Sequence, residues 1–498
     1  MDALKQFLEN ASSIIWGPFL LIPLLLGVGV FLTLRLGGIQ FRMLFPALRL
    51  GLIKRADPQA KGDISQYQAL ATALAATVGT GNIVGVATAI AIGGPGALFW
   101  VWVTGLAGMA TKYAETFLAV RFRGTDEAGE KSGGPQYYLE RGIRGRLGKV
   151  LGVSFAVFTT IACFGIGNMT QGNAIASNLE ASWSLPVGAV GVGLALMTFV
   201  VLVGGIKWIG RVTATLVPLM IVFYVTGGLY ILAVNVSALP AALSLILSDA
   251  FTGTSAVGGF AGSTILIAMR TGVARGLFSN ESGLGSAAMA AAAAKTTHPV
   301  RQGLVAMTQT FIDTIIVVSI TGLTIVVTGT WQQTDPVSGE QISAAVMTGE
   351  AFAHGLPGQW GHWVVTMGIV LFAYSTILGW SYYGERNVER LVGRRGVMPY
   401  RVLYSMVVFV GCTSELTTVW TFSDVANGLM ALPNLVGLIL LSGLVMRETS
   451  YYLRHDPTLI ATRDEVEAFM AGRPGWAQWK AGDVIGSSRR GLGQRGGE

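Results

Sequence analysis

The sequence has little charge. Asp, Glu, Lys and Arg together make up 12% of its 498 residues, whereas a soluble domain carries about 25%. Hydrophobic residues supply 52% of the chain, and its mean hydropathy is +0.57. A chain with so few charges cannot cover a water-exposed surface with polar groups, so the composition predicts an all-α integral membrane protein whose main surroundings are the lipid bilayer.

The chain also lacks the residues of common catalytic and metal sites. Its only cysteines, Cys163 and Cys412, both lie inside apolar segments, which excludes a disulfide framework and zinc-ligand spacing. The four histidines are scattered. Gly79-Thr80-Gly81-Asn82 lacks the lysine of a phosphate-binding loop. With no nucleophile and base in a recognisable arrangement, the sequence predicts that the protein is not an enzyme.

The formal net charge of +7 does not indicate nucleic-acid binding. The basic residues lie in short connections between apolar segments, as membrane topology requires. We therefore expect no nucleic-acid partner.

Apolar segments of spanning length number about eleven. They cover residues 14–34, 66–92, 96–120, 150–175, 185–205, 212–234, 240–274, 303–329, 361–384, 399–418 and 421–446. The first one lacks a basic leader and a small-residue cleavage site, so it is predicted to be a retained helix and not a signal peptide. The segment after residue 450 is polar and then rich in Gly and Arg, which predicts a largely disordered tail over 451–498.

Lys and Arg occupy alternate connections. The connections near 93–95, 176–184, 235–239, 330–360 and 419–420 contain neither residue. Because basic loops stay in the cytoplasm, this asymmetry predicts a cell-membrane protein with its N-terminus outside and its C-terminus in the cytoplasm. The long outer connection 330–360 can serve as a lid or as an ordinary solvated loop.

One apolar segment is interrupted by small and polar residues. Residues 75–85 read Ala-Ala-Thr-Val-Gly-Thr-Gly-Asn-Ile-Val-Gly in the middle of the second segment. Glycine weakens a helix, and a broken backbone persists in a membrane only where it is buried in protein or lines a cavity. The stretch therefore indicates either an ion and substrate site of a transporter or a glycine-rich helix-packing face.

The remainder of the chain favours the transporter. With the 14–34 helix set aside, the chain divides into two halves, 66–234 and 240–446, within a transmembrane domain over 1–450. The second half carries Phe251-Thr252-Gly253-Thr254-Ser255-Ala256-Val257-Gly258-Gly259-Phe260 inside its first segment. Paired interruptions at corresponding positions of halves with opposite topology indicate a transporter binding site.

Three blocks carry a family resemblance. They are Val78–Val84, Gly93–Trp102 with Gly105 and Gly108, and Arg275–Ser286. Over about residues 10–450 the chain resembles the alanine or glycine:cation symporter family, although Val101 and Ser282 depart from its pattern. The resemblance implies a leucine-transporter-type fold with five-plus-five inverted repeats and broken first and sixth core helices. It also implies symport of a small neutral amino acid, alanine or glycine, with Na⁺.

Hard oxygen ligands suit Na⁺. The interruption offers backbone carbonyls around Thr77, Gly79 and Thr80. In the implied fold, the span that holds Ser375 and Thr376 closes a sodium site against the broken helix. The alternative is that both hydroxyls bond only their own helix backbone.

A zwitterionic substrate needs donors for its carboxylate and acceptors for its ammonium group. The half-helix that begins near Thr80, Gly81 and Asn82 offers free N–H groups and a positive dipole end. Other candidate substrate contacts are Gln171, Gly259 and Thr376, with Phe260 and Trp380 limiting side-chain size.

Asp313 is an acidic residue within the 303–329 segment and therefore a functional candidate. It can act as a proton carrier, as a gate, or by bonding Thr310 or Gln309. Proton coupling is thus the alternative to Na⁺ coupling, and a channel is a further alternative class. Lys112 and Glu115 are expected to pair structurally, and the Ser279–Glu281 block is expected to gate or order a loop without contacting substrate.

Overall fold

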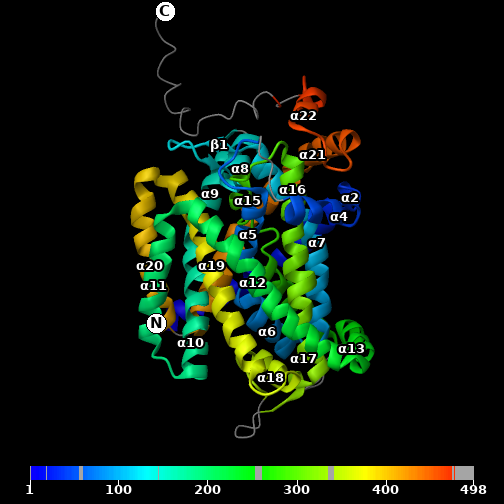
Figure 1. Cartoon of the computed structure of the whole chain (residues 1–498), viewed down its shortest axis with the longest axis vertical. Coiled ribbons are helices and arrows are strands. Elements are labelled where there is room, and N and C mark those ends of the chain that lie inside the picture. Colours follow the sequence, from blue (N-terminus) through cyan, green and yellow to red (C-terminus); the bar gives the residue numbers. More distant parts are fainter. Residues whose placement is uncertain are drawn as a thin grey trace, which may run out of the picture.

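A computed structural model describes residues 2–17, 19–54, 60–143, 145–252, 261–334, 341–414, 416–473 and 476. Helices dominate these residues (Figure 1). The first half contains α1 (Asp2–Ile15), α2 (Leu21–Arg35), α3 (Ile39–Arg42), α4 (Leu44–Leu48), η1 (Arg49–Lys54), α5 (Gln66–Thr77), η2 (Gly81–Gly85), α6 (Val86–Gly93), α7 (Gly96–Arg121), α8 (Pro135–Ile143), α9 (Gly145–Phe164), η3 (Gly165–Met169), α10 (Thr170–Trp183), α11 (Val187–Val203) and α12 (Gly205–Val234). The second half contains η4 (Val236–Ala238), α13 (Leu239–Thr252), α14 (Ala261–Asn280), α15 (Ala288–Ala292), α16 (Pro299–Thr310), η5 (Phe311–Val318), α17 (Ser319–Thr328), η6 (Thr330–Gln332), α18 (Ala344–Gly355), α19 (Trp360–Val392), η7 (Arg394–Gly396), α20 (Val397–Thr413), α21 (Leu416–His455) and α22 (Arg463–Met470).

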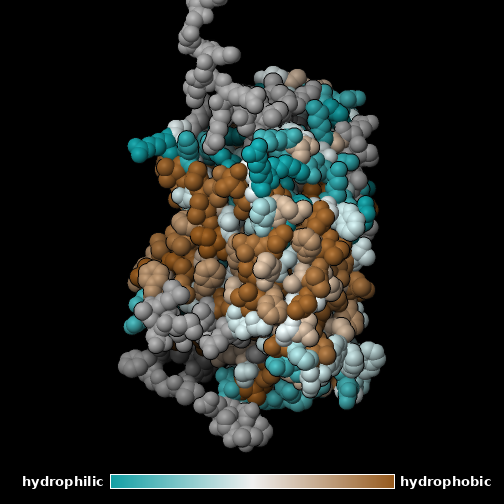
Figure 2. Space-filling view, turned by 90° about the vertical axis from the view of Figure 1, so that its left-hand side faces the viewer, coloured by the Kyte–Doolittle hydropathy of each residue, from teal (hydrophilic) through white to brown (hydrophobic). Residues whose placement is uncertain are grey.

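The long helices run between two polar ends. One end carries α8, α22 and the short hairpin of β1 (Gly124–Thr125) and β2 (Lys131–Ser132), and the other carries α13 and α18 (Figure 1). We call them the α22 end and the α18 end. Figure 2 shows a broad hydrophobic band between hydrophilic ends. Large apolar side chains such as Leu196 (63% exposed) and Leu219 (62% exposed) face outward on α11 and α12, as they do on a surface in contact with lipid.

The all-α membrane class is confirmed. Among the described residues, six helices are long and apolar enough to cross a membrane, and seven if one bent pair counts as a single span. Helices occupy each of the apolar segments that the sequence indicates. The count of about eleven spans and the five-plus-five inverted repeat stay predictions.

The structure corrects several predicted boundaries. The N-terminal helix α2 begins at Leu21 and not at residue 14, because a separate helix, α1, precedes it. The 240–274 segment is not one described span: α13 ends at Thr252, and α14 continues to Asn280. Gly259 and Phe260 lie outside the described residues, so the second predicted interruption stays a prediction.

The first predicted interruption is confirmed. Ser65 and Gln68 form a capping box that starts α5. The helix ends at Thr77, where Val78 leaves helical geometry with φ −76° and ψ 87°. The chain resumes as η2 and α6, and the two parts are bent by 53°. Thr80, Gly81 and Asn82 are buried at the bend, so the irregular backbone is shielded by protein, as a membrane requires.

The first part of the tail, which the sequence predicts to be largely disordered, contains helix. Helix α21 runs on to His455, and Thr462 with Glu465 forms a capping box that starts α22. Asp456 accepts a hydrogen bond from Arg301 Nη2 at 2.8 Å, which ties this region to α16. The Thr-x-x-Glu capping pattern was the sequence signal for this additional helix.

Candidate functional site

The bend between α5 and η2 is stabilised by the side chain of Asn82. Its Oδ1 accepts a hydrogen bond from Gly79 N at 2.9 Å. A Cβ built on Gly79 would lie 2.5 Å from Thr376 Oγ1 and 3.2 Å from Gln171 Oε1. The chain therefore needs glycine here, because two polar side chains from other helices approach its backbone closely.

Gln171 reaches the bend from α10. Its Oε1 accepts a hydrogen bond from Thr80 N at 3.2 Å, while its Nε2 donates to Ile166 O at 2.9 Å. The hydroxyl of Thr80 is buried, and no partner for it is found among the described residues. A buried polar atom without a partner is costly, so this hydroxyl is available to a ligand at the bend.

Ser375 and Thr376 contact the last turn of α5. Both hydroxyls donate to Ala75 O, at 3.2 and 2.9 Å, and both also donate to Phe372 O in their own helix. The hydroxyls therefore bond their own helix backbone and also reach the broken helix, and the sodium site itself stays a prediction. The Ala75 carbonyl and the two hydroxyls are hard oxygen groups of the kind that alkali cations prefer, and this set fits Na⁺.

Asp313 lies at the same bend and not beside its predicted neighbours. Its Oδ1 accepts from Asn82 Nδ2 at 2.7 Å, and its Oδ2 accepts from Ser279 Oγ at 2.9 Å and from Thr314 Oγ1 at 2.8 Å. The expected bonds to Thr310 or Gln309 are not made. The π-helical turns of η5 are wider than α-helical ones and place these groups differently.

Trp380 is fully buried one helical turn beyond Thr376. Its Nε1 donates to Glu281 Oε1 at 2.7 Å, and its side chain packs against Gly167 in η3. Helix α19 runs from the α18 end toward the α22 end (Figure 1), so Trp380 lies one turn farther along it toward the α22 end than Thr376.

Two predicted residues make other contacts. The Thr77 hydroxyl bonds the carbonyls of Ala73 and Leu74 in its own helix. Gly81 lies against Phe278 and Ser279 of α14, where an added Cβ would be 3.2 Å from each. The structure thus brings Gly79, Thr80, Gly81, Asn82, Gln171, Ser375 and Thr376 to one bend.

Sequence reasoning missed the contacts made by the last turn of α14 and by the residue that follows it. Ser279 bonds Asp313, and Glu281 bonds Trp380, so both residues approach the bend. The structural pairing of Lys112 with Glu115 is present at 3.9 Å. Glu115 Oε1 accepts from the backbone N–H groups of Gly283 and Gly285 at 2.9 and 3.0 Å. The glycines and serines that follow Glu281 in the sequence, from Ser282 to Ser286, were the available signal that this segment packs closely against Glu115.

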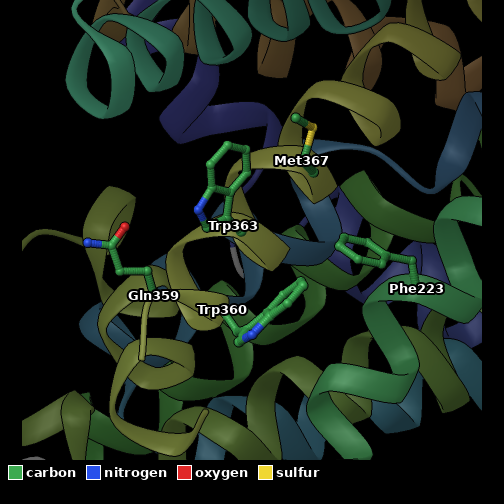
Figure 3. Close-up of a pocket in the computed structure, with 5 residues that line it drawn as sticks. All are labelled: Phe223, Gln359, Trp360, Trp363 and Met367. Atoms are coloured by element: carbon green, nitrogen blue, oxygen red, sulfur yellow. The ribbon is translucent and has the colours of Figure 1, made fainter. Parts of the chain in front are cut away.

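A separate pocket lies at the beginning of α19 and contains none of the predicted site residues. It has a volume of about 340 Å³ and is lined by Phe223, Gln359, Trp360, Trp363 and Met367. In Figure 3 the two indoles of α19 and the ring of Phe223 from α12 face this space. Its lining is mainly aromatic, and Gln359 is the one amide side chain among these lining residues.

Known proteins resemble this chain over most of its length. The family model described as "Sodium:alanine symporter family" matches residues 1–464. The sodium/alanine symporter AgcS of Methanococcus maripaludis is 50% identical over 450 residues, which cover 90% of this chain and 97% of that protein. A probable sodium/glutamine symporter, GlnT of Bacillus subtilis, is 35% identical over 91% of this chain and 92% of its own. A putative sodium/proton-dependent alanine carrier protein, YrbD of the same species, is 34% identical over 88% of this chain and 90% of its own.

Proposed function

This chain belongs to the sodium:alanine symporter family and is a sodium-coupled amino-acid symporter, and on that premise we propose that it imports alanine, with glycine as the second candidate, by alternating access. The observation that carries this proposal is the bend at Val78–Thr80. Buried backbone and an unpartnered Thr80 hydroxyl meet the side chains of Gln171 and Thr376 there, among the residues that the structure describes.

The amino acid is proposed to bind at the bend between α5 and η2. Its carboxylate would face the N–H groups near Thr80 and Gly81, where the positive end of η2 and α6 favours an anion. Gln171 and Asn82 already bond this backbone. A bound carboxylate can take over the N–H of Thr80 from Gln171 at little cost, since that bond is long at 3.2 Å.

Na⁺ is the co-transported substrate, and we propose that it binds between α5 and α19. The oxygen groups are Ala75 O, Ser375 Oγ and Thr376 Oγ1, together with the backbone at Thr77, Gly79 and Thr80. The hydroxyls can turn their lone pairs toward a cation while their protons stay on Phe372 O. Ion and amino acid would then share Thr376 and Thr80, which couples their binding.

The proposed orientation places the α22 end in the cytoplasm. Arg123, Arg301, Arg386 and Arg394 all lie in ion pairs or hydrogen bonds at this end, which agrees with retention of basic groups inside the cell. Alternating access would move the halves 66–234 and 240–446 against each other around the bend.

Substrate size is proposed to be limited by bulky side chains at the bend. Trp380 is the described candidate, and Phe260 is a second candidate outside the described residues, next to the proposed substrate contact Gly259. Alanine and glycine have almost no side chain, so a pocket selects them by excluding larger ones.

Proton coupling through Asp313 is the second candidate function. It is supported by the name of the YrbD relative, which describes that protein as a putative sodium/proton-dependent alanine carrier. Three donors point at the two carboxylate oxygens of Asp313. This arrangement suits an ionised carboxylate better than one that must repeatedly take up a proton. Na⁺ therefore remains the preferred ion.

The experiment is uptake of labelled alanine into proteoliposomes at fixed pH on both sides. We expect uptake with an inward Na⁺ gradient and none when K⁺ or choline replaces Na⁺. Uptake driven by a pH gradient without Na⁺ would overturn the assignment of the ion. Absence of any Na⁺-dependent alanine or glycine uptake, with other amino acids transported, would overturn the assignment of the substrate.

A further inference from the structure

Glu281 is a buried acidic side chain without a role in the proposed binding of Na⁺ or the amino acid. Its residue is 1% exposed. Its Oε1 accepts a hydrogen bond from Trp380 Nε1 at 2.7 Å, and its Oε2 accepts one from Ser286 Oγ at 2.5 Å. Its backbone carbonyl accepts a bond from Lys112 Nζ at 3.0 Å. Helices α7, α14 and α19 therefore meet at this one residue.

The backbone of Glu281 is strained. It is the first residue after α14, and its φ is +56°. Helices commonly end with such a left-handed residue, but that residue is usually glycine because a Cβ is unfavourable there. A residue kept in a strained backbone conformation needs contacts that hold it there, and residues of this kind gather at functional sites. The contacts of Glu281 include Trp380 and Lys112.

The Trp380 side chain packs against a glycine. A Cβ on Gly167 would overlap the Cβ of Trp380, and a Cβ on the neighbouring Gly379 would lie 2.7 Å from the Cβ of Ala76 in α5. The Trp380 side chain is therefore in contact with η3, and α19 is in contact with the last turn of α5 at the preceding residue. Within this tight space, the bond to Glu281 fixes which way the indole N–H points.

We propose that Glu281 is a positioning residue for substrate selection: its carboxylate holds the Trp380 indole across the α22 side of the amino-acid site. This inference rests on the proposed function, because Trp380 must limit the size of the substrate. Glu281 itself does not touch the amino acid. It acts by preventing the indole from turning away and enlarging the pocket.

The Glu281–Trp380 bond lies within the second half of the chain, beside two contacts that reach the first half. Ser279, two residues before Glu281, holds Asp313, which in turn holds Asn82 at the bend. Trp380 follows Thr376, which bonds Ala75. Residues 279–281 thus contact Asp313 beside the bend and Trp380 on α19. A shift of these residues would change both contacts together.

The experiment measures how well unlabelled serine, valine and leucine compete with labelled alanine for Na⁺-driven uptake. In Glu281→Ala the indole loses its acceptor. The concentration of unlabelled valine that halves the uptake of labelled alanine is then expected to fall about 10-fold or more, relative to the corresponding concentration of unlabelled alanine. Glu281→Gln keeps a carbonyl oxygen for the indole N–H, and it is expected to restore the wild-type profile. Rescue by this variant separates positioning from a need for negative charge.

Trp380→Phe keeps an aromatic ring and removes the N–H, so it should produce the same shift as Glu281→Ala. The double variant should shift no further than either single one, since both changes break one bond. Trp102→Phe is the matched control: Trp102 also loses an indole bond, in this case to Ser319 Oγ at 2.8 Å, and selectivity should stay unchanged.

Several results would overturn the proposal. These are an unchanged competition profile in Trp380→Phe, additive shifts in the double variant, or a Glu281→Gln profile that equals that of Glu281→Ala. If Glu281→Ala does not insert, Trp380→Phe and Glu281→Gln still decide between the outcomes. If wild-type protein takes up neither alanine nor glycine, the proposed function fails. The positioning bond is then tested separately by ¹⁹F NMR of 5-fluorotryptophan protein: the Trp380 signal must move in Glu281→Ala and stay near its wild-type position in Glu281→Gln.

Discussion

Asn82 Nδ2 donates a hydrogen bond to Asp313 Oδ1 across 2.7 Å, and this bond joins the bend of the first half of the chain to η5 of the second. The same asparagine accepts a bond from Gly79 N with its Oδ1. Both the oxygen and the nitrogen of the side-chain amide are therefore hydrogen-bonded, and these two partners fix its orientation. The carboxylate of Asp313 thus helps to hold Asn82, and with it the bend, in place.

Asp313→Asn should weaken transport without changing the coupling ion. The new amide has one acceptor oxygen where the carboxylate has two, so a buried donor loses its partner at a cost of about 1–3 kcal/mol. We expect alanine uptake to fall about 5- to 150-fold and to remain dependent on Na⁺. Uptake assays with and without a pH gradient make the measurement.

The control for this change is Asp249→Asn, a buried aspartate on α13 that bonds Gly96 N at 2.8 Å outside the bend. It should leave the Na⁺ dependence unaltered. If wild-type uptake needs only a pH gradient and Asp313→Asn abolishes that response, Asp313 is the proton carrier after all.

Gly79→Ala should strongly impair alanine binding. The added Cβ would lie 2.5 Å from Thr376 Oγ1, so the bend and α19 must separate, which costs about 1–3 kcal/mol. An affinity loss of about 5- to 150-fold follows, measured as the alanine concentration for half-maximal uptake. Gly85→Ala is the matched control, because its Cβ would meet nothing closer than Thr80 O at 4.0 Å. Equal uptake by both variants would mean that the approach of Thr376 to Gly79 has no functional role.

Replacing Ser375 and Thr376 together by Ala should raise the Na⁺ concentration for half-maximal uptake by about tenfold or more, since two oxygen ligands worth at least ~1.4 kcal/mol are lost. Thr160→Ala serves as control, since the Thr160 hydroxyl bonds Ala156 O in its own helix. A double variant with unchanged Na⁺ dependence would remove these hydroxyls from the sodium site.

The sequence was sufficient to predict the bend, because glycine, threonine and asparagine seldom gather in the middle of an unbroken apolar helix. It also identified Gln171, Ser375 and Thr376, which are polar groups deep within apolar helices. It did not predict the partners of Asp313, since the π-helical turns of η5 rotate this residue relative to a regular helix. Nor did it place Ser279 and Glu281, because their contacts depend on how far α14 continues beyond residue 274.

The α22 end contains a second feature that the sequence did not predict. Arg386 is buried among carboxylates, with N–O distances of 3.1 Å to Asp126, 2.8 Å to Glu385 and 3.0 Å to Glu389. These residues are far apart in the sequence or adjacent on α19, and only the fold shows that the loop containing Asp126 returns to α19. The cluster ties that loop to the end of the helix that carries Thr376.

Arg386→Met should destabilise the protein by about 3–5 kcal/mol, because it leaves buried carboxylates without their counter-ion. The measurement is thermal unfolding of detergent-solubilised protein, with the exposed Arg395→Met as control. The control should unfold within about 0.5 kcal/mol of wild type. Unchanged unfolding of Arg386→Met would show that the cluster contributes little to stability.

Alanine-stimulated entry of ²²Na⁺ into proteoliposomes tests the central claim most directly, because it follows the ion itself. With no Na⁺ gradient imposed and alanine added only outside, the account predicts that ²²Na⁺ enters with alanine, and that this entry is strongly reduced in Gly79→Ala and retained in Gly85→Ala. Alanine entry without any ²²Na⁺ movement, or equal ²²Na⁺ entry in both glycine variants, would contradict it.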